Sequence, residues 1–304
     1  MDHPALLNMI ELAQKPEKLD ATVEYLAEKL HFLRKNEKVL VCFAQDRVGC
    51  LGDLMEQAVI RREADPIMVG SDWRWKTILW LAFSNRVSTI IAPPLIVLGL
   101  SKLAKYKRTP LYIRNVVTAG YPCQDWMIDG IIRGLDCNTW GCFGSRDGSV
   151  IAGFSCGKSR GVHLRDEEYG VRIQDEAGRE VPEGEIGEMI LYPRADPQMA
   201  FPMGERARID RTPCPCGCPS PRLMDMNYGS STNPDLAPLG QHLQSWTSVL
   251  DCRLKKSAYG LEMEILTFPG EKLPKLPTAA KLMIRTWDPE LDEPFFYVPG
   301  IENM

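Results

Sequence analysis

The sequence has little of several features that mark particular classes of protein. Its 304 residues include only four histidines, and the net charge is −4 with no block of five or more like charges. This charge pattern argues against nucleic-acid binding and against a polybasic membrane anchor. The most apolar stretch, residues 89–100, contains Pro93 and Pro94 and is too short to cross a bilayer. We therefore expect neither nucleic acid nor a membrane as a partner.

The N-terminus lacks the basic-then-apolar order of a secretory signal peptide, which predicts a cytoplasmic protein. In a reducing compartment the ten cysteines should mostly remain thiols. Metal binding is then the better explanation for any tight cluster of them. The isolated Cys42, Cys137 and Cys252 lie in apolar runs, as is typical of small buried hydrophobic residues.

The first 120 residues alternate between two kinds of apolar pattern. Residues 5–35 and the stretches 51–62 and 96–105 have helical spacing, and short apolar runs typical of buried strands occur at 38–43, 66–69, 87–91 and 111–117. Strands that alternate with helices predict a doubly wound parallel sheet of the α/β class, covered on both faces. Trp73, Trp75 and Trp80 have near-helical spacing and are expected to pack in the core, with the lining of a pocket as the alternative.

The pattern changes after Gly120. A helix is predicted at 125–135, and the turn-rich stretch 163–192 predicts an antiparallel β segment. Residues 230–239 are rich in turn-forming residues and predict a linker. We therefore expect a core domain at 1–229 and a small C-terminal α+β or β module at 230–304, with strands near 249–253, 261–268 and 281–287.

Four side chains in the second half of the sequence form a complete set of zinc ligands. Cys156 precedes His163 by seven positions, and Cys214 precedes Cys216 by two. Three thiolates and one imidazole fill a tetrahedral shell and leave no open position for catalysis, so the predicted zinc is structural. Cys218 is an alternative to Cys214 or Cys216. The other interpretation, surface thiols beside an unliganded histidine, is less favoured because paired cysteines in a cytosolic chain usually bind metal.

Four motifs occur in order along the chain: VVTAGYP at 116–122, FGSRD at 143–147, EVPEGEIGE at 180–188 and RARID at 206–210. Together they resemble the adenylate-forming (AMP-binding) superfamily, specifically its phenylacetate–coenzyme A ligase and coenzyme F390 synthetase branch. The resemblance covers residues 38–223 and is truncated and divergent. That branch often carries cysteines and a histidine where this sequence has its predicted zinc ligands.

The resemblance implies a set of nucleotide contacts. The first motif would lie against the adenine and the carboxylate, the second would stack on adenine and hold magnesium, and the last would bind the ribose; the residues so implied are Gly120, Tyr121, Phe143, Gly144, Asp147 and Asp210. Each acidic or aromatic member has a second interpretation. Asp210 can pair with neighbouring arginines, Phe143 can belong to the core, and Asp147 stands in an Asp-Gly pair typical of turns.

Two departures from the family pattern bear on activity. No loop rich in serine, threonine and glycine is present to cradle ATP phosphates. None of the C-terminal lysines at 255, 256, 272, 275 and 281 has the flanking residues of the family's catalytic lysine, so no catalytic residue is assigned. The sequence therefore supports two hypotheses. The first is a ligase that uses ATP and Mg²⁺ to convert a small-molecule carboxylate into an acyl-adenylate and passes the acyl group to a thiol such as coenzyme A or to an amine. The second is a catalytically degenerate relative that binds a nucleotide or another small ligand as a subunit or regulator, in a homodimer or with a partner subunit.

Overall fold

The computed structural model describes residues 4–70, 72–145, 150–228, 246–257, 260–271 and 281–295. The chain opens with two helices, α1 (Pro4–Ala13) and α2 (Pro16–Lys29). Pro16 stands in the first turn of α2, where a missing backbone N–H removes no helical hydrogen bond. None of the described helices is both long and apolar enough to cross a membrane.

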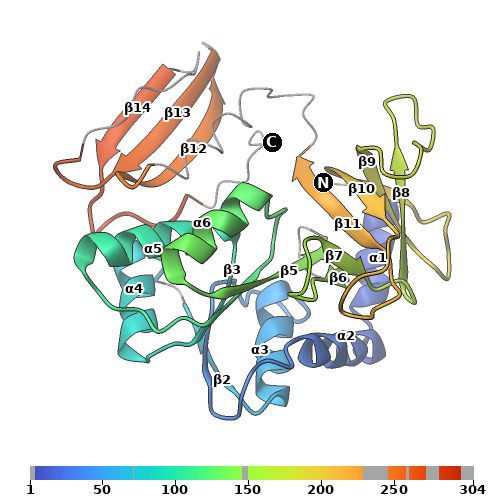
Figure 1. Cartoon of the computed structure of the whole chain (residues 1–304), viewed down its shortest axis with the longest axis horizontal. Helices are drawn as coiled ribbons and strands as arrows, with labels where there is room; N and C mark the ends of the chain where they lie inside the picture. The colour runs from blue at the N-terminus through green and yellow to red at the C-terminus, as the bar shows by residue number, and fades with distance from the viewer. Residues whose placement is uncertain are drawn as a thin grey trace.

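A parallel sheet with helices on both faces follows, which confirms the predicted doubly wound arrangement (Figure 1). Its strands lie in the order β2-β1-β3-β4-β5, and each neighbouring pair is parallel. The elements run β1 (Lys38–Val41), α3 (Leu51–Arg61), β2 (Asp65–Met68), α4 (Trp75–Ser84), β3 (Thr89–Ala92), α5 (Pro94–Lys107), β4 (Asn115–Thr118), α6 (Asp125–Leu135) and β5 (Asn138–Gly144).

The predicted antiparallel segment continues this same sheet to eleven strands. Beyond β5 the order is β6-β7-β11-β10-β9-β8, with every neighbouring pair antiparallel. The strands are β6 (Ile151–Phe154), β7 (Val162–Leu164), β8 (Tyr169–Gln174), β9 (Gly187–Pro193), β10 (Phe201–Asp210) and β11 (Arg222–Tyr228). Strand β5 is the junction, because it pairs with β4 up to Gly141 and with β6 from Cys142 onward.

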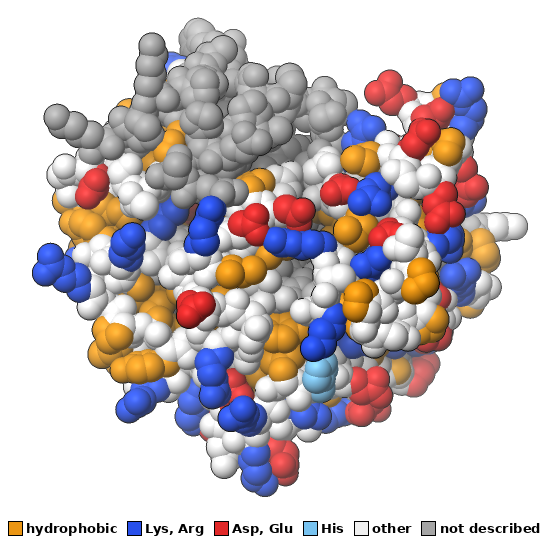
Figure 2. Space-filling model, viewed as in Figure 1, with side chains coloured by type: hydrophobic (Ala, Val, Ile, Leu, Met, Phe, Trp, Pro, Cys, Tyr) orange, Lys and Arg blue, Asp and Glu red, His pale blue; other side chains and the backbone are white. Residues whose placement is uncertain are grey.

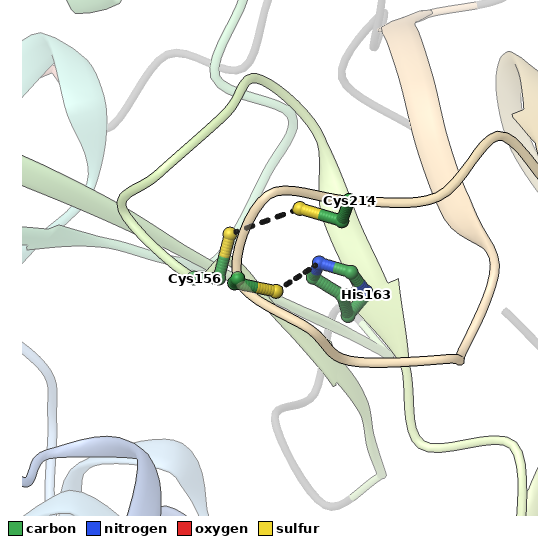
Figure 3. Close-up of side chains that lie close together, drawn as sticks. Cys156, His163 and Cys214 are labelled. Atoms are coloured by element: carbon green, nitrogen blue, oxygen red, sulfur yellow. Dashed lines mark hydrogen bonds between the residues drawn. The ribbon is translucent and has the colours of Figure 1, made fainter.

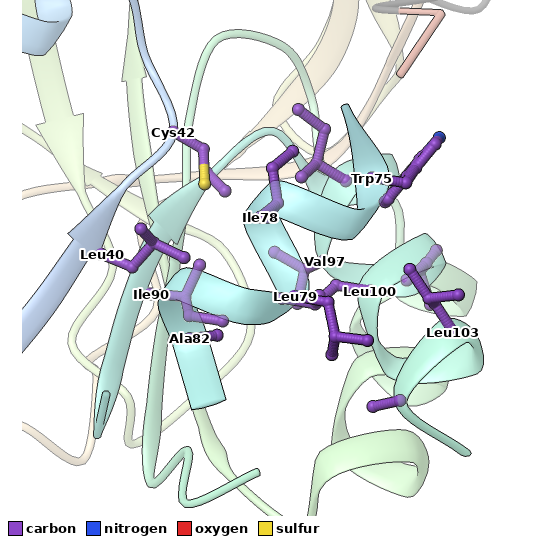
Figure 4. Packing of buried hydrophobic residues seen from close by; sticks show 14 of the residues in the cluster. Leu40, Cys42, Trp75, Ile78, Leu79, Ala82, Ile90, Val97, Leu100 and Leu103 are labelled. Atoms are coloured by element: carbon purple, nitrogen blue, oxygen red, sulfur yellow. The ribbon is translucent and has the colours of Figure 1, made fainter. Parts of the chain in front are cut away.

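The parallel strands bury both of their faces. Leu40, Ile90 and Val116 pack against α4, α5 and α6, as part of the cluster drawn in Figure 4. The alternate residues, such as Val39 and Ile91, pack on the opposite side with α2 and α3. Successive side chains of a strand point to opposite faces, so an unbroken apolar run is the pattern expected of a strand covered on both sides.

Helix α4 places one of the three tryptophans that were predicted to pack in the core on the surface instead. Trp75 is fully buried and Trp73 is half-buried, but 62% of Trp80 is exposed. Trp80 lies on the outer face of the helix, because the buried positions are Trp75, Ile78, Leu79 and Ala82, three or four residues apart. The prediction of a core position was therefore wrong for Trp80.

A separate three-stranded sheet lies at the C-terminal end of the described chain. Strands β12 (Val249–Ser257) and β13 (Gly260–Thr267) are antiparallel, and β14 (Lys281–Thr286) runs parallel to β13. Phe268 and Trp287 join the core cluster around α5, where the Phe268 ring stacks on Tyr106 with centroids 4.4 Å apart. The predicted linker at 230–239 lies outside the described residues.

Asp251 is a buried acid in the contact between β12 and α5. Its carboxylate accepts backbone N–H groups from Cys252 and Phe295, both at 2.8 Å. Burial raises the pKa of Asp251 to about 7, although these hydrogen bonds and the nearby Lys102 lower it. Burial also lowers the pKa of Lys102 to about 8. The contact therefore holds two groups whose ionised forms are both disfavoured by burial.

Replacing Asp251 with asparagine is expected to change the pH dependence of stability. The folded-state pKa lies above the unfolded value of about 3.9, so folding favours the protonated acid and the wild type loses stability as pH rises from about 4 through 7. Asp251→Asn removes this loss, and its unfolding free energy relative to wild type should increase across that interval. Urea denaturation at several pH values measures the difference, and identical pH slopes in the two proteins would contradict the prediction.

Candidate metal centre and binding cavity

The four predicted metal ligands converge from three places in the antiparallel half of the sheet. Cys156 follows β6, His163 belongs to β7, and Cys214 and Cys216 lie in the turn between β10 and β11. Their ligand atoms all lie within 4.8 Å of one another. Figure 3 shows the Cys156 and Cys214 sulfurs pointing toward each other beside the His163 ring. The strand pairing of β7 with β11 brings the two halves of the cluster together.

The spacing of the donor atoms fits a tetrahedral metal ion. Metal–sulfur bonds of about 2.3 Å and metal–nitrogen bonds of about 2.0 Å place two sulfurs about 3.8 Å apart and sulfur and nitrogen about 3.5 Å apart. The Sγ atoms of Cys156 and Cys214 are separated by 3.7 Å. The Cys216 Sγ and His163 Nε2 atoms are separated by 3.4 Å. These two separations match a tetrahedral metal site, and the remaining donor pairs lie within 4.8 Å.

Hydrogen bonds from the surroundings orient these four groups. His163 Nδ1 lies 2.9 Å from the carbonyl oxygen of Ser220, which leaves Nε2 facing the cluster. Backbone N–H groups donate to two of the sulfurs, from Lys158 to Cys156 at 3.4 Å and from Cys218 to Cys216 at 3.3 Å. The Cys218 thiol itself lies outside the group of four.

The thiol pKa values show why the cluster favours a cation. Burial opposes ionisation of Cys214, but the Ser159 hydroxyl and the Cys216 backbone lower its pKa to about 6. Burial and the neighbouring thiols raise the pKa of Cys216 to about 11. Ionisation of one thiol therefore opposes ionisation of its neighbour when no positive charge lies between them. A divalent cation reverses this effect, because each thiolate then faces positive charge.

A cavity of about 720 Å³ lies beside the cluster, at the carboxyl end of β4 and the junction in β5. A cavity of this size fits a small-molecule ligand, and ligands commonly bind where the strand order of an α/β sheet changes. Four of the predicted nucleotide contacts line it, namely Gly120, Tyr121, Phe143 and Gly144. Gly120 turns the chain out of β4 with a φ of +88°, a conformation that favours glycine. Over the face shown in Figure 2, acidic and basic side chains are interspersed.

The other two predicted contacts are not placed in the cavity wall. Asp147 lies outside the described residues. Asp210 is absent from the residues that the described chain contributes to the wall, and its carboxylate is engaged elsewhere. Its Oδ1 atom accepts the N–H and hydroxyl of Thr212, at 2.9 and 2.6 Å, and Oδ2 accepts an Arg222 N–H at 2.6 Å. The bonds from Thr212 and the Arg222 charge lower the pKa of Asp210.

Several wall residues carried no recognisable signal in the sequence. Glu205 and Asp225 come from β10 and β11, and Trp140 comes from β5, where it stacks on Phe32 with ring centroids 3.9 Å apart. Asp225 has a φ of +54°, in the left-handed region that aspartate adopts more readily than most residues. The irregular pairing of β10 with β11 brings these acids to the wall, and pairing irregularities leave no sequence motif.

No family model and no curated protein matches this sequence. Among solved structures, a 2-hydroxyisobutyryl-CoA ligase in the postadenylation state, in complex with R3-HIB-AMP, has a TM-score of 0.70 at 12% identity, over 95% of this chain and 70% of that chain. The same ligase in its thioesterification state has a TM-score of 0.62 at 14% identity, with the same coverage. A benzoate CoA ligase from Burkholderia xenovorans has a TM-score of 0.52 at 14% identity, over 84% of this chain and 56% of that chain. These similarities show that the chain has the fold of adenylate-forming CoA ligases.

Proposed function

We propose that the protein is an adenylate-forming ligase-like protein that binds a nucleotide and a small-molecule carboxylate in the cavity. One observation carries the proposal: Gly120, Tyr121, Phe143 and Gly144, which come from two separate sequence motifs, line the same cavity. The fold supports it, because the similar 2-hydroxyisobutyryl-CoA ligase holds an acyl-adenylate. Site chemistry, and not fold alone, has to decide the activity.

The proposed reaction has two steps. A carboxylate oxygen attacks the α-phosphate of ATP and expels pyrophosphate, and a thiol or amine then displaces AMP from the acyl-adenylate. Mg²⁺ would stabilise the phosphate charge in the first step. In this chain the turn at Gly120 and Tyr121 would form the adenosine wall. The Tyr121 hydroxyl accepts the Leu95 N–H at 3.1 Å, which ties this turn to the first turn of α5.

We propose that the metal is zinc and that its role is structural. Three thiolates and one imidazole form a closed set of ligands that matches zinc and leaves no position for a substrate. The ion would join the β6–β7 hairpin to the turn between β10 and β11. We also propose that the protein is cytoplasmic, with residues 1–229 forming an adenylate-forming-like core and 230–304 a small C-terminal domain.

The second candidate function is binding without turnover. The sequence has no phosphate-cradling loop, and the one candidate catalytic lysine whose side chain is described, Lys281, is exposed and pairs with Glu262 at 3.5 Å. ATP–pyrophosphate exchange across a panel of carboxylates separates the two candidates. Exchange above background supports the ligase, whereas AMP binding without exchange supports the binding protein. If the protein showed no AMP binding and no exchange, both candidate functions would be refuted.

Filling the cavity is expected to abolish AMP binding. A Cβ atom added at Gly141 would lie 3.5 Å from Val162 and 3.8 Å from Thr118, which are ordinary contact distances, so the first atom of a side chain fits there. All three residues line the cavity. Gly141→Leu should weaken AMP binding at least about a hundredfold, because the added side chain occupies space that the ligand needs. Isothermal titration measures the affinity.

Gly141→Ala is the matched control for this change. Its single methyl group meets ordinary contact distances, so AMP should bind within a few fold of the wild-type affinity. Circular dichroism should show the same fold in both variants. If Gly141→Leu bound AMP with wild-type affinity, AMP would have to bind outside this cavity.

A further inference from the structure

One stretch of chain belongs both to the cavity and to the surroundings of the metal cluster. Residues 157–161, the wall segment, line the cavity between Cys156 and His163. Glycines with left-handed φ values, +67° and +89°, form its two ends. A Cβ atom at Gly161 would lie 2.8 Å from the carbonyl oxygen of Leu223, so this end is packed closely on β11. The Gly161 end of the wall segment is therefore held against β11.

Opposite sides of the wall segment have different anchors. The Arg160 guanidinium donates to Asp129 of α6 at 2.5 Å and lies 3.7 Å from Asp125. Ser159 faces the other way, with its Oγ atom 3.1 Å from the Cys214 sulfur. The segment thus spans from helix α6 to a metal ligand.

Arg222 links Ser159 to the turn that carries the metal-binding cysteines. Its guanidinium is buried, with the side chain 8% exposed. One terminal nitrogen donates to Ser159 Oγ at 2.7 Å. The other donates to Asp210 Oδ2 at 2.6 Å and to Thr212 Oγ1 at 3.0 Å. Because Ser159 accepts from Arg222, its own hydroxyl hydrogen is available to the Cys214 sulfur.

We propose that Ser159 and Arg222 are positioning residues through which the metal cluster fixes the cavity wall. This inference rests on the proposed binding of a nucleotide in the cavity. With the metal bound, Cys214 is a fixed acceptor for Ser159, and Arg222 holds Ser159 against Asp210. Without the metal, Cys214 is no longer a fixed acceptor, and the wall segment keeps only its contacts with α6, with β11 and with Arg222. The metal thereby raises the affinity of the cavity while contacting no ligand.

The charges of the metal cluster, Arg222 and Asp210 support this coupling between the metal and the cavity. Three thiolates around a divalent cation carry a net negative charge, and Arg222 supplies a buried positive charge one hydroxyl away. Asp210 balances the other side of the guanidinium. Coupling of this kind is reciprocal, so the bound nucleotide must increase metal affinity by the same factor by which the metal increases nucleotide affinity.

The first test measures AMP affinity in metal-loaded Ser159→Ala. The substitution removes the hydroxyl and keeps the backbone, and it should weaken AMP about three- to tenfold, the effect of one hydrogen bond, while metal content stays at the wild-type level. Ser101→Ala is the control, because it removes a hydroxyl that donates to the Leu98 carbonyl within α5, away from the cavity wall and the cluster. Ser159→Thr restores a hydroxyl and should recover part of the affinity. Equal AMP affinity in Ser159→Ala and wild type would overturn the proposal.

The second test needs no nucleotide. Cobalt(II) placed in the cluster has thiolate-to-metal absorption bands that respond to hydrogen bonding at the sulfur. Asp210→Asn should shift these bands, because Asp210 is linked to the Cys214 sulfur through Arg222 and Ser159. The hydrogen bonds of Asp210 go to Arg222 and Thr212 and to none of the four metal ligands. Asp175→Asn is the control, since Asp175 accepts comparable hydrogen bonds from Arg179 in the turn after β8 and is linked to neither Arg222 nor Ser159 by them.

The two tests separate the two proposals. If AMP does not bind the wild type, the proposed function fails and the cobalt spectra decide the positioning roles. Bands shifted in Asp210→Asn and unchanged in Asp175→Asn support those roles. Unshifted bands in Asp210→Asn overturn them, whatever the result with AMP.

Discussion

Cys214→Ser is expected to release the proposed zinc ion and to destabilise the antiparallel half of the sheet. A serine hydroxyl is a poor ligand for zinc beside two thiolates, so metal content should fall from about one ion per chain to near zero. Structural zinc contributes on the order of 10 kcal/mol in small zinc-dependent folds, comparable to the whole stability of a typical domain. We therefore expect the turn between β10 and β11 and the β6–β7 hairpin to separate.

Metal analysis and hydrogen exchange measure the two parts of this prediction. Elemental analysis gives the stoichiometry, and exchange should accelerate in β7 and β11 while the parallel strands stay protected. Cys218→Ser is the matched control, because the Cys218 thiol lies outside the group of four. If Cys218→Ser lost the metal and Cys214→Ser kept it, the assignment of ligands would be wrong.

Trp75→Ala is expected to destabilise the parallel half of the protein strongly. The Trp75 side chain is fully buried under α5, where a Cβ atom at Gly99 would come within 2.2 Å of the indole ring. Its removal leaves a cavity that this close packing cannot fill by collapse, and should lower the unfolding free energy by about 3–5 kcal/mol. Urea denaturation followed by circular dichroism measures the loss.

Helix α4 provides the control for this substitution within the same ten residues. Trp80 is 62% exposed, so Trp80→Ala should change the unfolding free energy by no more than about 0.5 kcal/mol. A similar loss in both variants would mean that Trp80 is covered in solution. Gly99→Ala should also destabilise the protein, by about 1–3 kcal/mol, because overpacking against Trp75 outweighs the helix propensity gained.

The parts of the fold that could be predicted are those with a local signal. Strands such as β3 and β4 are short, fully buried segments with a pair of β-branched apolar residues at the centre, and α6 begins and ends at the predicted residues, Asp125 and Leu135. Helix α4 was not predicted as an element. Its buried positions have helical spacing, but Trp80, Leu81 and Phe83 are also apolar and obscure the period.

The candidate site also has parts that the sequence could predict and parts that it could not. Cysteine and histidine spacing predicted four residues that the structure places together, because metal ligands have a short list of residue types. The engagement of Asp210 by Arg222, and the position of Asp225 in the cavity wall, depend on how β10 pairs with β11. The arginines beside Asp210 in the sequence suggested an ion pair, but its partner is Arg222 on the neighbouring strand, and no local pattern identifies that register.

The arrangement of the metal ligands has a consequence for the order of folding. Cys214 and Cys216 are near neighbours along the chain, but Cys156 and Cys214 are 58 positions apart. Closing a loop of that length is entropically unfavourable until the strands between the two cysteines have formed. An ion captured early can hold only a neighbouring pair of ligands, and its coordination is completed only when β7 reaches β11. We therefore expect full coordination to be among the last steps of folding, and a slow step in refolding that excess metal does not accelerate.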